Sequence, residues 1–162
     1  MWYVASAFVL VAVFLLRRIA SDNTGESVSL SPRDAAIQNA AREYGIAPEL
    51  LFAIGWKESK LVLHSRGALD ELGPFQMRPA TFADVHEGNP SLMLTSWVVA
   101  SNSAAAYVVW LLERPGVDGD TTKMLQAYNG GIGKLQNGRV PPAAIRYATD
   151  VVKIMGERSF SA

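Results

Sequence analysis

The alternation of hydrophobic and polar positions divides the chain into an apolar start, a short polar stretch and a long segment of helical pattern. Residues 1–16 contain no charged side chain, proline or glycine, and this apolar run ends at Arg17 and Arg18. A helix over residues 1–20, with both arginines reaching the membrane interface, is about 30 Å long and matches the hydrocarbon core of a bilayer. Because a cleaved signal peptide places its basic residues before the apolar run, we predict an uncleaved transmembrane anchor over 1–20.

Polar residues without helical periodicity fill 21–30, which predicts a flexible tether between the anchor and a folded domain over 31–162. Arg17 and Arg18 favour a cytoplasmic location for that domain, since positive residues next to an apolar segment stay inside the cell. Two arginines are a weak determinant, so the opposite topology, with the domain in the periplasm, is the alternative.

In residues 31–162 the apolar positions recur every three to four residues and no run alternates with period two, so we predict a mainly α fold. Ser31 and Pro32 are typical of a helix start, and Gly45 is typical of a helix end. The predicted helices are 32–44, one that begins at Pro48, 79–85, a central core helix over 90–113 for which a break around 101–103 is one option, 120–128 and 143–156. A turn-rich stretch covers 64–73 and a glycine-rich loop covers 129–142.

A carboxylate lies within the apolar face of the second predicted helix. Glu58 follows Ile54 by four residues and Leu51 by seven, so its side chain lies on the same side as these core positions. Burial disfavours the charged form of a carboxyl and raises its pKa, which would suit Glu58 to general acid catalysis, as in glycoside cleavage. The alternative places Glu58 at the exposed end of the helix, paired with Lys57 or Lys60.

Length, charge and composition exclude several classes of function. The 162 residues suffice for one domain with a short appendage. Lys and Arg, 15 in all, balance 15 Asp and Glu, so no net positive charge is available for binding nucleic acid. The chain has no cysteine and its two histidines, His64 and His86, lack zinc-binding spacing, so we expect no metal site. The glycines after residue 129 follow a helix rather than a strand, which argues against a dinucleotide-binding site.

Two further segments carry residue types suited to ligand binding. Gln76 stands in an otherwise apolar patch between Gly73 and Pro79, where its amide either binds an amide or hydroxyl of a ligand or satisfies a turn. Residues 127–131, Ala-Tyr-Asn-Gly-Gly, follow a predicted helix. The two glycines either let a ligand approach the backbone or simply end the helix.

Taken in this order, the three segments resemble the lytic transglycosylase domain of the soluble-lytic-transglycosylase type, in the lysozyme superfamily, over about residues 33–156. The matching residues are Glu58 and Ser59 at the end of an apolar helix, Gly73, Gln76, Pro79, Ala80 and Thr81, then Ala127, Tyr128, Asn129, Gly130 and Gly131, and finally Tyr147. This family cleaves the glycan strands of peptidoglycan. The resemblance therefore implies a lysozyme-like helical domain that binds these strands and needs no cofactor.

The resemblance also implies a role for each matching residue. Glu58 would be the single acid and base: it protonates the oxygen between N-acetylmuramic acid and N-acetylglucosamine, then accepts a proton from the C6 hydroxyl and leaves a 1,6-anhydromuramyl end. Tyr147 is expected to reach toward Glu58, and Ser65 to contact the acetamido group of the sugar. The residues assigned to substrate binding are Ser65, Gln76, Tyr128, Asn129 and Tyr147.

One loop departs from the family pattern. Residues 69–72 separate a Gly-Ala pair from Gly73 where the family has a single residue. The insertion brings Asp70 and Glu71 into the segment that crosses the cleft, as candidates for the second carboxylate with which an inverting hydrolase positions water. A hydrolytic muramidase is therefore one alternative, whereas two solvated carboxylates at a loop tip would leave the transglycosylase reading unchanged.

Two other functions stay open on the same scaffold. One is a peptidoglycan endopeptidase, and the other is a non-catalytic glycan-binding membrane protein of a virion or secretion complex, with protein partners there. The presence of Glu58 together with Gln76 and Tyr128 favours an enzyme. With the predicted anchor, the expected location is a virion membrane or the bacterial inner membrane, from which the domain acts on peptidoglycan in the periplasm during phage entry or secretion.

Overall fold

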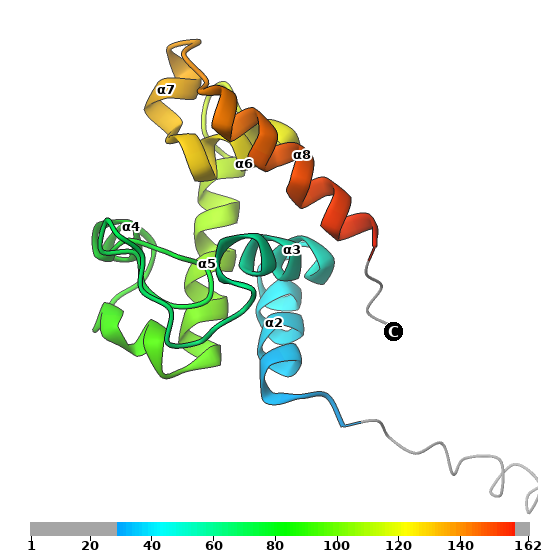
Figure 1. Ribbon diagram of the computed structural model, residues 1–162, viewed down its shortest axis with the longest axis vertical. Coiled ribbons are helices and arrows are strands. Elements are labelled where there is room, and N and C mark those ends of the chain that lie inside the picture. Colours follow the sequence, from blue (N-terminus) through cyan, green and yellow to red (C-terminus); the bar gives the residue numbers. More distant parts are fainter. Residues whose placement is uncertain (1–28, 158–162) are drawn as a thin grey trace, which may run out of the picture. The chain divides into compact units, whose positions relative to one another are not determined.

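Helix α5 (Trp97–Leu112) runs through the middle of the helical domain in the computed structural model, which describes residues 29–157 (Figure 1). In chain order the other helices are α2 (Pro32–Glu43), α3 (Pro48–Ser59), α4 (Pro79–Val85), the 3-10 helix η1 (Pro90–Leu94), α6 (Thr121–Gly130), α7 (Ile132–Gln136) and α8 (Pro142–Gly156). Helix α5 packs against α2, α3, α4, η1 and α6, while α8 packs against α3 and α6. The prediction of a mainly α fold with a central helix is confirmed.

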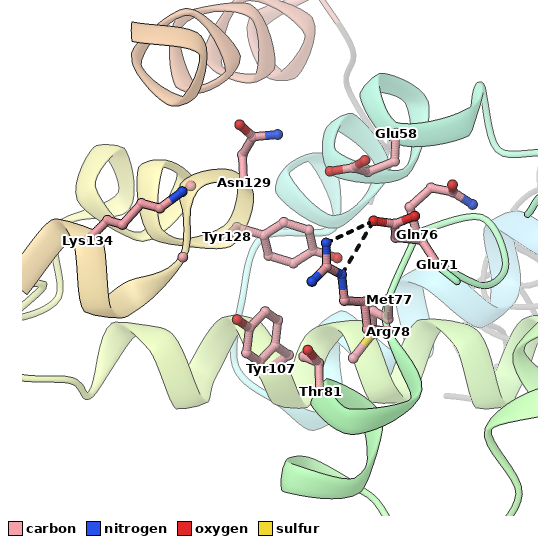
Figure 2. A pocket seen from close by; sticks show the side chains of 12 residues that line it. Glu58, Glu71, Gln76, Met77, Arg78, Thr81, Tyr107, Tyr128, Asn129 and Lys134 are labelled. Atoms are coloured by element: carbon pink, nitrogen blue, oxygen red, sulfur yellow. Dashed lines mark hydrogen bonds and ion pairs between the residues drawn. The ribbon is translucent and has the colours of Figure 1, made fainter. Parts of the chain in front are cut away.

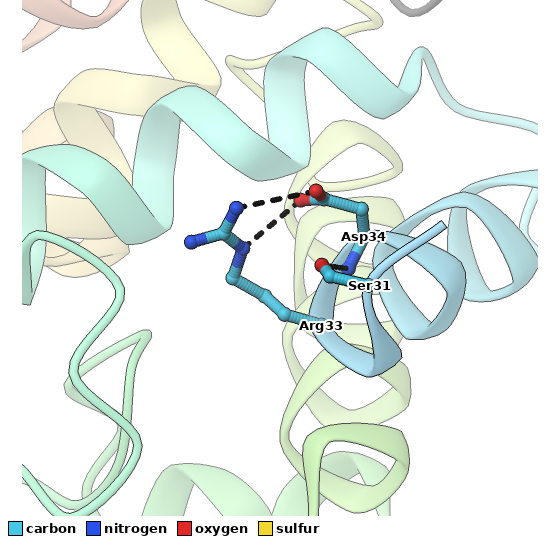
Figure 3. A network of polar contacts seen from close by, with 3 residues as sticks. All are labelled: Ser31, Arg33 and Asp34. Atoms are coloured by element: carbon cyan, nitrogen blue, oxygen red, sulfur yellow. Dashed lines mark hydrogen bonds and ion pairs between the residues drawn. The ribbon is translucent and has the colours of Figure 1, made fainter. Parts of the chain in front are cut away.

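The start of α2 lies where the sequence predicts it. The Ser31 hydroxyl accepts a hydrogen bond from the backbone N–H of Asp34 at 3.1 Å, and Pro32 occupies the first turn. The Asp34 carboxylate lies near the positive end of the helix dipole and also pairs with Arg33 at 2.9 Å (Figure 3). A side-chain cap of this kind contributes about 1 kcal/mol, so residues within the first turn favour the start of the helix at this position.

The predicted 90–113 helix is divided between Leu94 and Trp97 rather than around 101–103. A 3-10 helix ends at Leu94, and Ser96 caps α5 by accepting a hydrogen bond from the N–H of Val99 at 3.2 Å. The expected break around 101–103 is wrong, because α5 continues through both serines there. The Ser103 hydroxyl donates to the carbonyl oxygen of Val99 at 2.7 Å, one turn earlier, and so satisfies its polar group within the helix.

The predicted glycine-rich loop over 129–142 is also partly wrong, since it contains the short helix α7. Helix α6 continues to Gly130, and Gly131 takes a φ of +91°, a left-handed value that lets the chain turn sharply. The carbonyl oxygen of Gly131 then accepts hydrogen bonds from the N–H groups of Lys134 and Leu135, which start the new helix. The loop therefore has a fixed backbone beside α6.

The apolar face predicted for the second helix forms part of the core. Leu51 and Ile54 on α3 are fully buried, and Leu61, just after the helix, is nearly so. They belong to one cluster with Phe75 and Met77 from the loop between α3 and α4. Burial of each such side chain stabilises the fold by about 1.5–3 kcal/mol, so this loop is anchored by apolar side chains on both sides of Gln76.

None of the helices in residues 29–157 is long and apolar enough to cross a membrane. The predicted transmembrane anchor, residues 1–20, and the tether up to residue 28 lie outside the described residues. The helical domain begins as a compact unit at Ser31, the residue at which the sequence analysis places the domain start.

Candidate active site

A pocket of about 400 Å³ lies where α3, the following loop and the start of α4 face α5 and the turn between α6 and α7 (Figure 2). Of the residues predicted from sequence, five line it: Glu58, Glu71, Gln76, Tyr128 and Asn129. In the described part of the chain, the lining does not include Ser65, Asp70 or Tyr147. The lining residues to which the sequence gives no role in the site are Met77, Arg78, Tyr107 and Lys134, together with three positions that match motifs only: Thr81, Gly130 and Gly131.

Glu58 lies in the last turn of α3, and its carboxyl is partly buried in the pocket wall. The pKa of this carboxyl is raised from 4.5 to about 7: burial is the largest cause and the charge of Glu71 adds to it, whereas the Tyr147 hydroxyl and the charge of Lys57 act in the opposite direction. The two lysines proposed as alternative partners are engaged elsewhere. Lys57 forms an ion pair with Asp150 on α8 at 2.6 Å, and Lys60 lies 5.3 Å from the centre of the Trp56 ring. Near neutral pH the protonated and charged forms of Glu58 are therefore both populated.

Two stacked tyrosines stand beside Glu58. The rings of Tyr128 and Tyr147 are nearly parallel, with centres 6.4 Å apart. The buried Tyr147 hydroxyl has no hydrogen bond of good geometry among residues 29–157, but it lies close enough to Glu58 to lower the pKa of that carboxyl. Burial and the nearby Glu58 raise the pKa of both hydroxyls well above the ordinary tyrosine value, so both stay protonated donors. Tyr147 thus lies close to Glu58 but outside the pocket lining, while Tyr128 lines the pocket.

Gln76 is positioned by a narrow hairpin between residues 72 and 77. Leu72 and Met77 exchange two backbone hydrogen bonds, of 2.8 and 3.2 Å, and Gln76 itself has a φ of +48°. Its side-chain amide donates to the carbonyl oxygen of Gly73 at 2.8 Å, so the amide nitrogen satisfies the turn. The side chain nevertheless lines the pocket. The interpretation as a turn residue is therefore confirmed for the amide nitrogen, and ligand binding by Gln76 stays a prediction.

The tip of this hairpin is held by two side chains from helices. The Ser59 hydroxyl, next to Glu58, donates to the carbonyl oxygen of Pro74 at 2.9 Å and accepts from the N–H of Val62 at 3.0 Å. The Tyr128 hydroxyl donates to the next carbonyl oxygen, that of Phe75, at 2.9 Å. Ser59 matched a motif but received no role from sequence. The structure shows that it ties the hairpin to the helix end that carries Glu58.

Replacing Tyr128 with phenylalanine should loosen this attachment. The change removes the donor to the buried Phe75 carbonyl, so we expect a loss of about 1 kcal/mol in the free energy of unfolding. The hairpin that carries Gln76 then shifts relative to Glu58, and activity on glycan should fall about tenfold. Thermal unfolding and initial rates would measure the two effects, with Tyr44→Phe, outside the pocket lining, as control. Full activity at unchanged stability in Tyr128→Phe would rule out this anchoring role.

Glu71 and Asp70 are adjacent in sequence but differ in position. Asp70 is exposed and has a φ of +63°, which fits the interpretation as a solvated loop tip. The Glu71 carboxylate instead lines the pocket, where it accepts a hydrogen bond from the N–H of Leu69 at 2.8 Å and faces the Arg78 guanidinium at 3.4 Å. Burial alone would raise the pKa of Glu71, but the backbone N–H groups of Leu69 and Glu71 and the side chain of Arg78 together lower it below the ordinary value. Glu71 is therefore charged at neutral pH.

Ser65 lies outside the pocket lining, and the contact of its side chain with the acetamido group stays a prediction. The carbonyl oxygen of Ser65 accepts a hydrogen bond from the N–H of Gly73 at 2.9 Å, so Ser65 supports the hairpin from behind. Tyr107 was assigned to the core, but its ring lies on the pocket wall with its centre 5.4 Å from that of Tyr128. Its place in the pocket lining and its half-buried side chain distinguish Tyr107 from the buried residues of α5.

Among residues 29–157, no group of three or more His, Cys, Asp or Glu side chains is arranged to hold a metal ion. His64, considered above for zinc, has its Nδ1 atom 2.6 Å from the carbonyl oxygen of Leu94. It therefore links the loop after α3 to η1.

Comparisons with known proteins agree with this geometry. A family model described as the transglycosylase SLT domain matches residues 35–141. Among solved structures, an inactive mutant of the lytic transglycosylase Slt from Pseudomonas aeruginosa is similar, with a TM-score of 0.68 at 16% sequence identity. That match covers 92% of this chain but 28% of the Slt chain. At this identity the likeness shows a shared fold, so the prediction of a lysozyme-like helical domain is confirmed. No curated protein matches the sequence.

Proposed function

The chain belongs to the transglycosylase SLT domain family, and on this premise we propose that it is a peptidoglycan lytic transglycosylase with Glu58 as its single acid and base. The observation that carries the proposal is the Glu58 carboxyl, whose pKa of about 7 arises in a pocket lined by the predicted sugar-binding side chains. An acid of this pKa can both give and take a proton at neutral pH, which a single residue must do if it serves both steps.

In the first step the protonated Glu58 carboxyl donates its proton to the glycosidic oxygen between N-acetylmuramic acid and N-acetylglucosamine. The bond from C1 of the muramic acid to that oxygen breaks, and N-acetylglucosamine leaves with a free hydroxyl. Positive charge develops at C1, where the carbonyl oxygen of the sugar's own 2-acetamido group stabilises it. Burial of Glu58 favours this step because it keeps the carboxyl protonated at a pH at which an ordinary glutamate is charged.

In the second step the Glu58 carboxylate accepts the proton of the C6 hydroxyl of the same muramic acid, and the C6 oxygen bonds to C1. The product is a 1,6-anhydromuramyl end, no water is consumed, and Glu58 returns to its protonated form. The Tyr147 hydroxyl, a buried donor beside Glu58, stabilises the carboxylate between the two steps.

The remaining pocket residues bind and orient the sugars in this proposal. Asn129 is exposed at the pocket wall and offers an amide donor and acceptor to an acetamido group. One N–H of the Gln76 amide is bound to the Gly73 carbonyl, so its carbonyl oxygen and its second N–H are left for a sugar hydroxyl or amide. Tyr128 supplies an aromatic wall while its hydroxyl holds the hairpin. We assign Ser65 to support of the hairpin, because its carbonyl oxygen binds Gly73.

Mass spectrometry of fragments released from purified peptidoglycan tests this proposal. The full chain should release fragments with 1,6-anhydromuramyl ends, and a Glu58→Gln variant should release none above background. Release of peptides from intact glycan strands would instead indicate an endopeptidase. Binding without release by both proteins would indicate the non-catalytic glycan-binding function.

The pH dependence of cleavage follows from Glu58. Because the first step requires its protonated form, kcat/KM should be constant below pH 7 and fall about tenfold per pH unit above the Glu58 pKa of about 7. The Glu71 charge raises that pKa, so Glu71→Gln should move the descending limb to lower pH. Initial rates on soluble glycan between pH 5 and 9 measure both effects. A rate that rises through pH 7, or a limb that Glu71→Gln leaves in place, would contradict this assignment.

A hydrolytic muramidase is the second candidate, and one observation favours it. Glu58 and Glu71 line the same pocket, and their surroundings raise the pKa of one carboxyl and lower that of the other. A protonated acid facing a charged carboxylate is the arrangement with which some glycosidases activate water. This function predicts hydrated reducing ends that disappear in Glu71→Gln. The transglycosylase predicts anhydro ends from both the wild type and that variant.

A further inference from the structure

Two cations line the pocket although the sugars of the proposed substrate carry no charge. Arg78 reaches it from the residue before α4, and Lys134 from α7. Figure 2 shows both side chains directed toward the space in front of Tyr128, from opposite sides. The cation that lowers the pKa of Glu58 is Lys57, which lies outside the lining, so neither Arg78 nor Lys134 is needed to adjust the pKa of Glu58.

Arg78 is held loosely. Its side chain is 53% exposed, and its two contacts to the Glu71 carboxylate are both 3.4 Å long. Glu71 has a shorter hydrogen bond, of 2.8 Å, from the N–H of Leu69 through its other oxygen. The guanidinium group therefore keeps most of its donors available in the pocket, and its planar fork matches a carboxylate well.

The backbone of Lys134 is held by two hydrogen bonds. Its N–H donates to the carbonyl oxygen of Gly131 at 3.2 Å, and its own carbonyl oxygen accepts from the N–H of Arg139 at 2.8 Å. In the described part of the chain, Lys134 forms no ion pair, and its side chain is exposed. Gly131, which also lines the pocket, has no atom within 4 Å of the position of a Cβ, so the space over its backbone is open to a branch of the substrate.

We propose that Arg78 and Lys134 bind carboxylates of the stem peptides carried by the muramic acid units, so that the protein prefers glycan whose peptides carry free carboxylates. The inference rests on the proposed function, because it takes peptidoglycan as the ligand of the pocket. The stem peptide is the anionic part of this polymer, since the lactyl carboxyl of muramic acid is used in the amide bond to the peptide. Two charge-assisted contacts from opposite walls would also fix the direction in which the strand crosses Glu58.

Binding to two matched substrates tests the proposal. Both are peptidoglycan with acetylated amino groups, and in one of them the carboxylates are further converted to methylamides. Cosedimentation of the full chain carrying Glu58→Gln gives a Kd for each without turnover. We expect about fivefold tighter binding to the anionic material, and a smaller preference at high salt. Either Lys134→Gln or Arg78→Gln should reduce the preference, while Lys123→Gln, an exposed lysine outside the pocket lining, should retain it.

The outcomes separate this inference from the proposed function. Equal binding to both substrates, binding to neither, or a preference that survives the double change Arg78→Gln and Lys134→Gln would overturn the carboxylate site. Cleavage of both substrates by the wild-type chain is measured in parallel. If neither is cut while the anionic one is bound more tightly, the carboxylate site stands and the transglycosylase activity fails.

Discussion

Glycan cleavage by the Glu58→Gln variant is expected to be about a thousandfold slower than by the wild type, because glutamine can neither donate a proton to the glycosidic oxygen nor accept one from the C6 hydroxyl. The amide has almost the same shape as the carboxyl, so Tyr147 and the hairpin keep their positions and substrate binding should change little. The loss therefore falls on kcat rather than on KM. Initial rates on soluble glycan over a range of concentrations measure this division, with Glu43→Gln, exposed on α2, as a control that should leave both constants unchanged.

The same variant should be more stable than the wild type at high pH. The pKa of Glu58 is about 7 in the folded protein and near 4.5 in the unfolded chain, so folding binds a proton between these values. Stability is therefore complete below pH 4.5 and is lost as the pH rises to about 7, by about 1–3 kcal/mol once partial exposure is allowed for. Glu58→Gln carries no such charge and should lack this loss. Denaturant unfolding at pH 5 and pH 8 measures it, and an equal pH dependence in both proteins would contradict the burial of Glu58.

The second large effect is expected at Gly73, where alanine should damage both stability and activity. Gly73 has a φ of +73°, and a Cβ there would lie 2.4 Å from the backbone oxygen of Met93 in η1. Since that oxygen belongs to backbone, the hairpin or η1 has to move. Left-handed strain and this clash together should cost about 2–4 kcal/mol of unfolding free energy. Displacement of Gln76 and Glu71 relative to Glu58 should lower kcat/KM about a hundredfold.

Gly119→Ala is the matched control for this change. Gly119 has a similar φ of +78°, but no atom lies within 4 Å of the position of its Cβ, and it lies in the turn before α6, outside the pocket lining. Its substitution should cost about 1–2 kcal/mol from backbone strain alone and leave kcat/KM unchanged. Chemical denaturation and initial rates on both variants would show whether contact with η1 sets the position of the hairpin. Equal losses in the two variants would argue against it.

Helix boundaries that a capping residue or a proline marks clearly could be predicted from the sequence, whereas a boundary inside a long, largely apolar run could not. Ser31 with Pro32 and the Pro79–Val85 helix were placed correctly because the cap or proline acts within one turn. The start of α5 at Ser96 was hidden within a long apolar run. No break occurs at Ser103, because its hydroxyl donates to the carbonyl oxygen one turn earlier and the helix continues.

The residues of the candidate site also fall into those that the sequence could predict and those that it could not. Glu58 could be found from its place in an apolar stripe, and its raised pKa agrees with burial of that stripe. The positions of Glu71 and Asp70 could not be told apart, because only the folded loop turns one carboxylate into the pocket and the other into solvent. The place of Tyr107 in the pocket could not be predicted for a similar reason: its helix is largely apolar, and its contact with Tyr128 joins two separate helices. A sequence pattern describes a single helix or loop, whereas the pocket forms where several helices and loops meet.

The central claim is that Glu58 drives an intramolecular attack rather than an attack by water, and isotope labelling tests it most directly. Purified peptidoglycan is digested by the full chain in water enriched in heavy oxygen, and the released fragments are analysed by mass spectrometry. If the C6 oxygen attacks, we expect muramyl ends that are lighter by one water molecule than hydrolysis products and contain no heavy oxygen. Reducing ends that carry one heavy oxygen would contradict it and would identify the protein as a hydrolase.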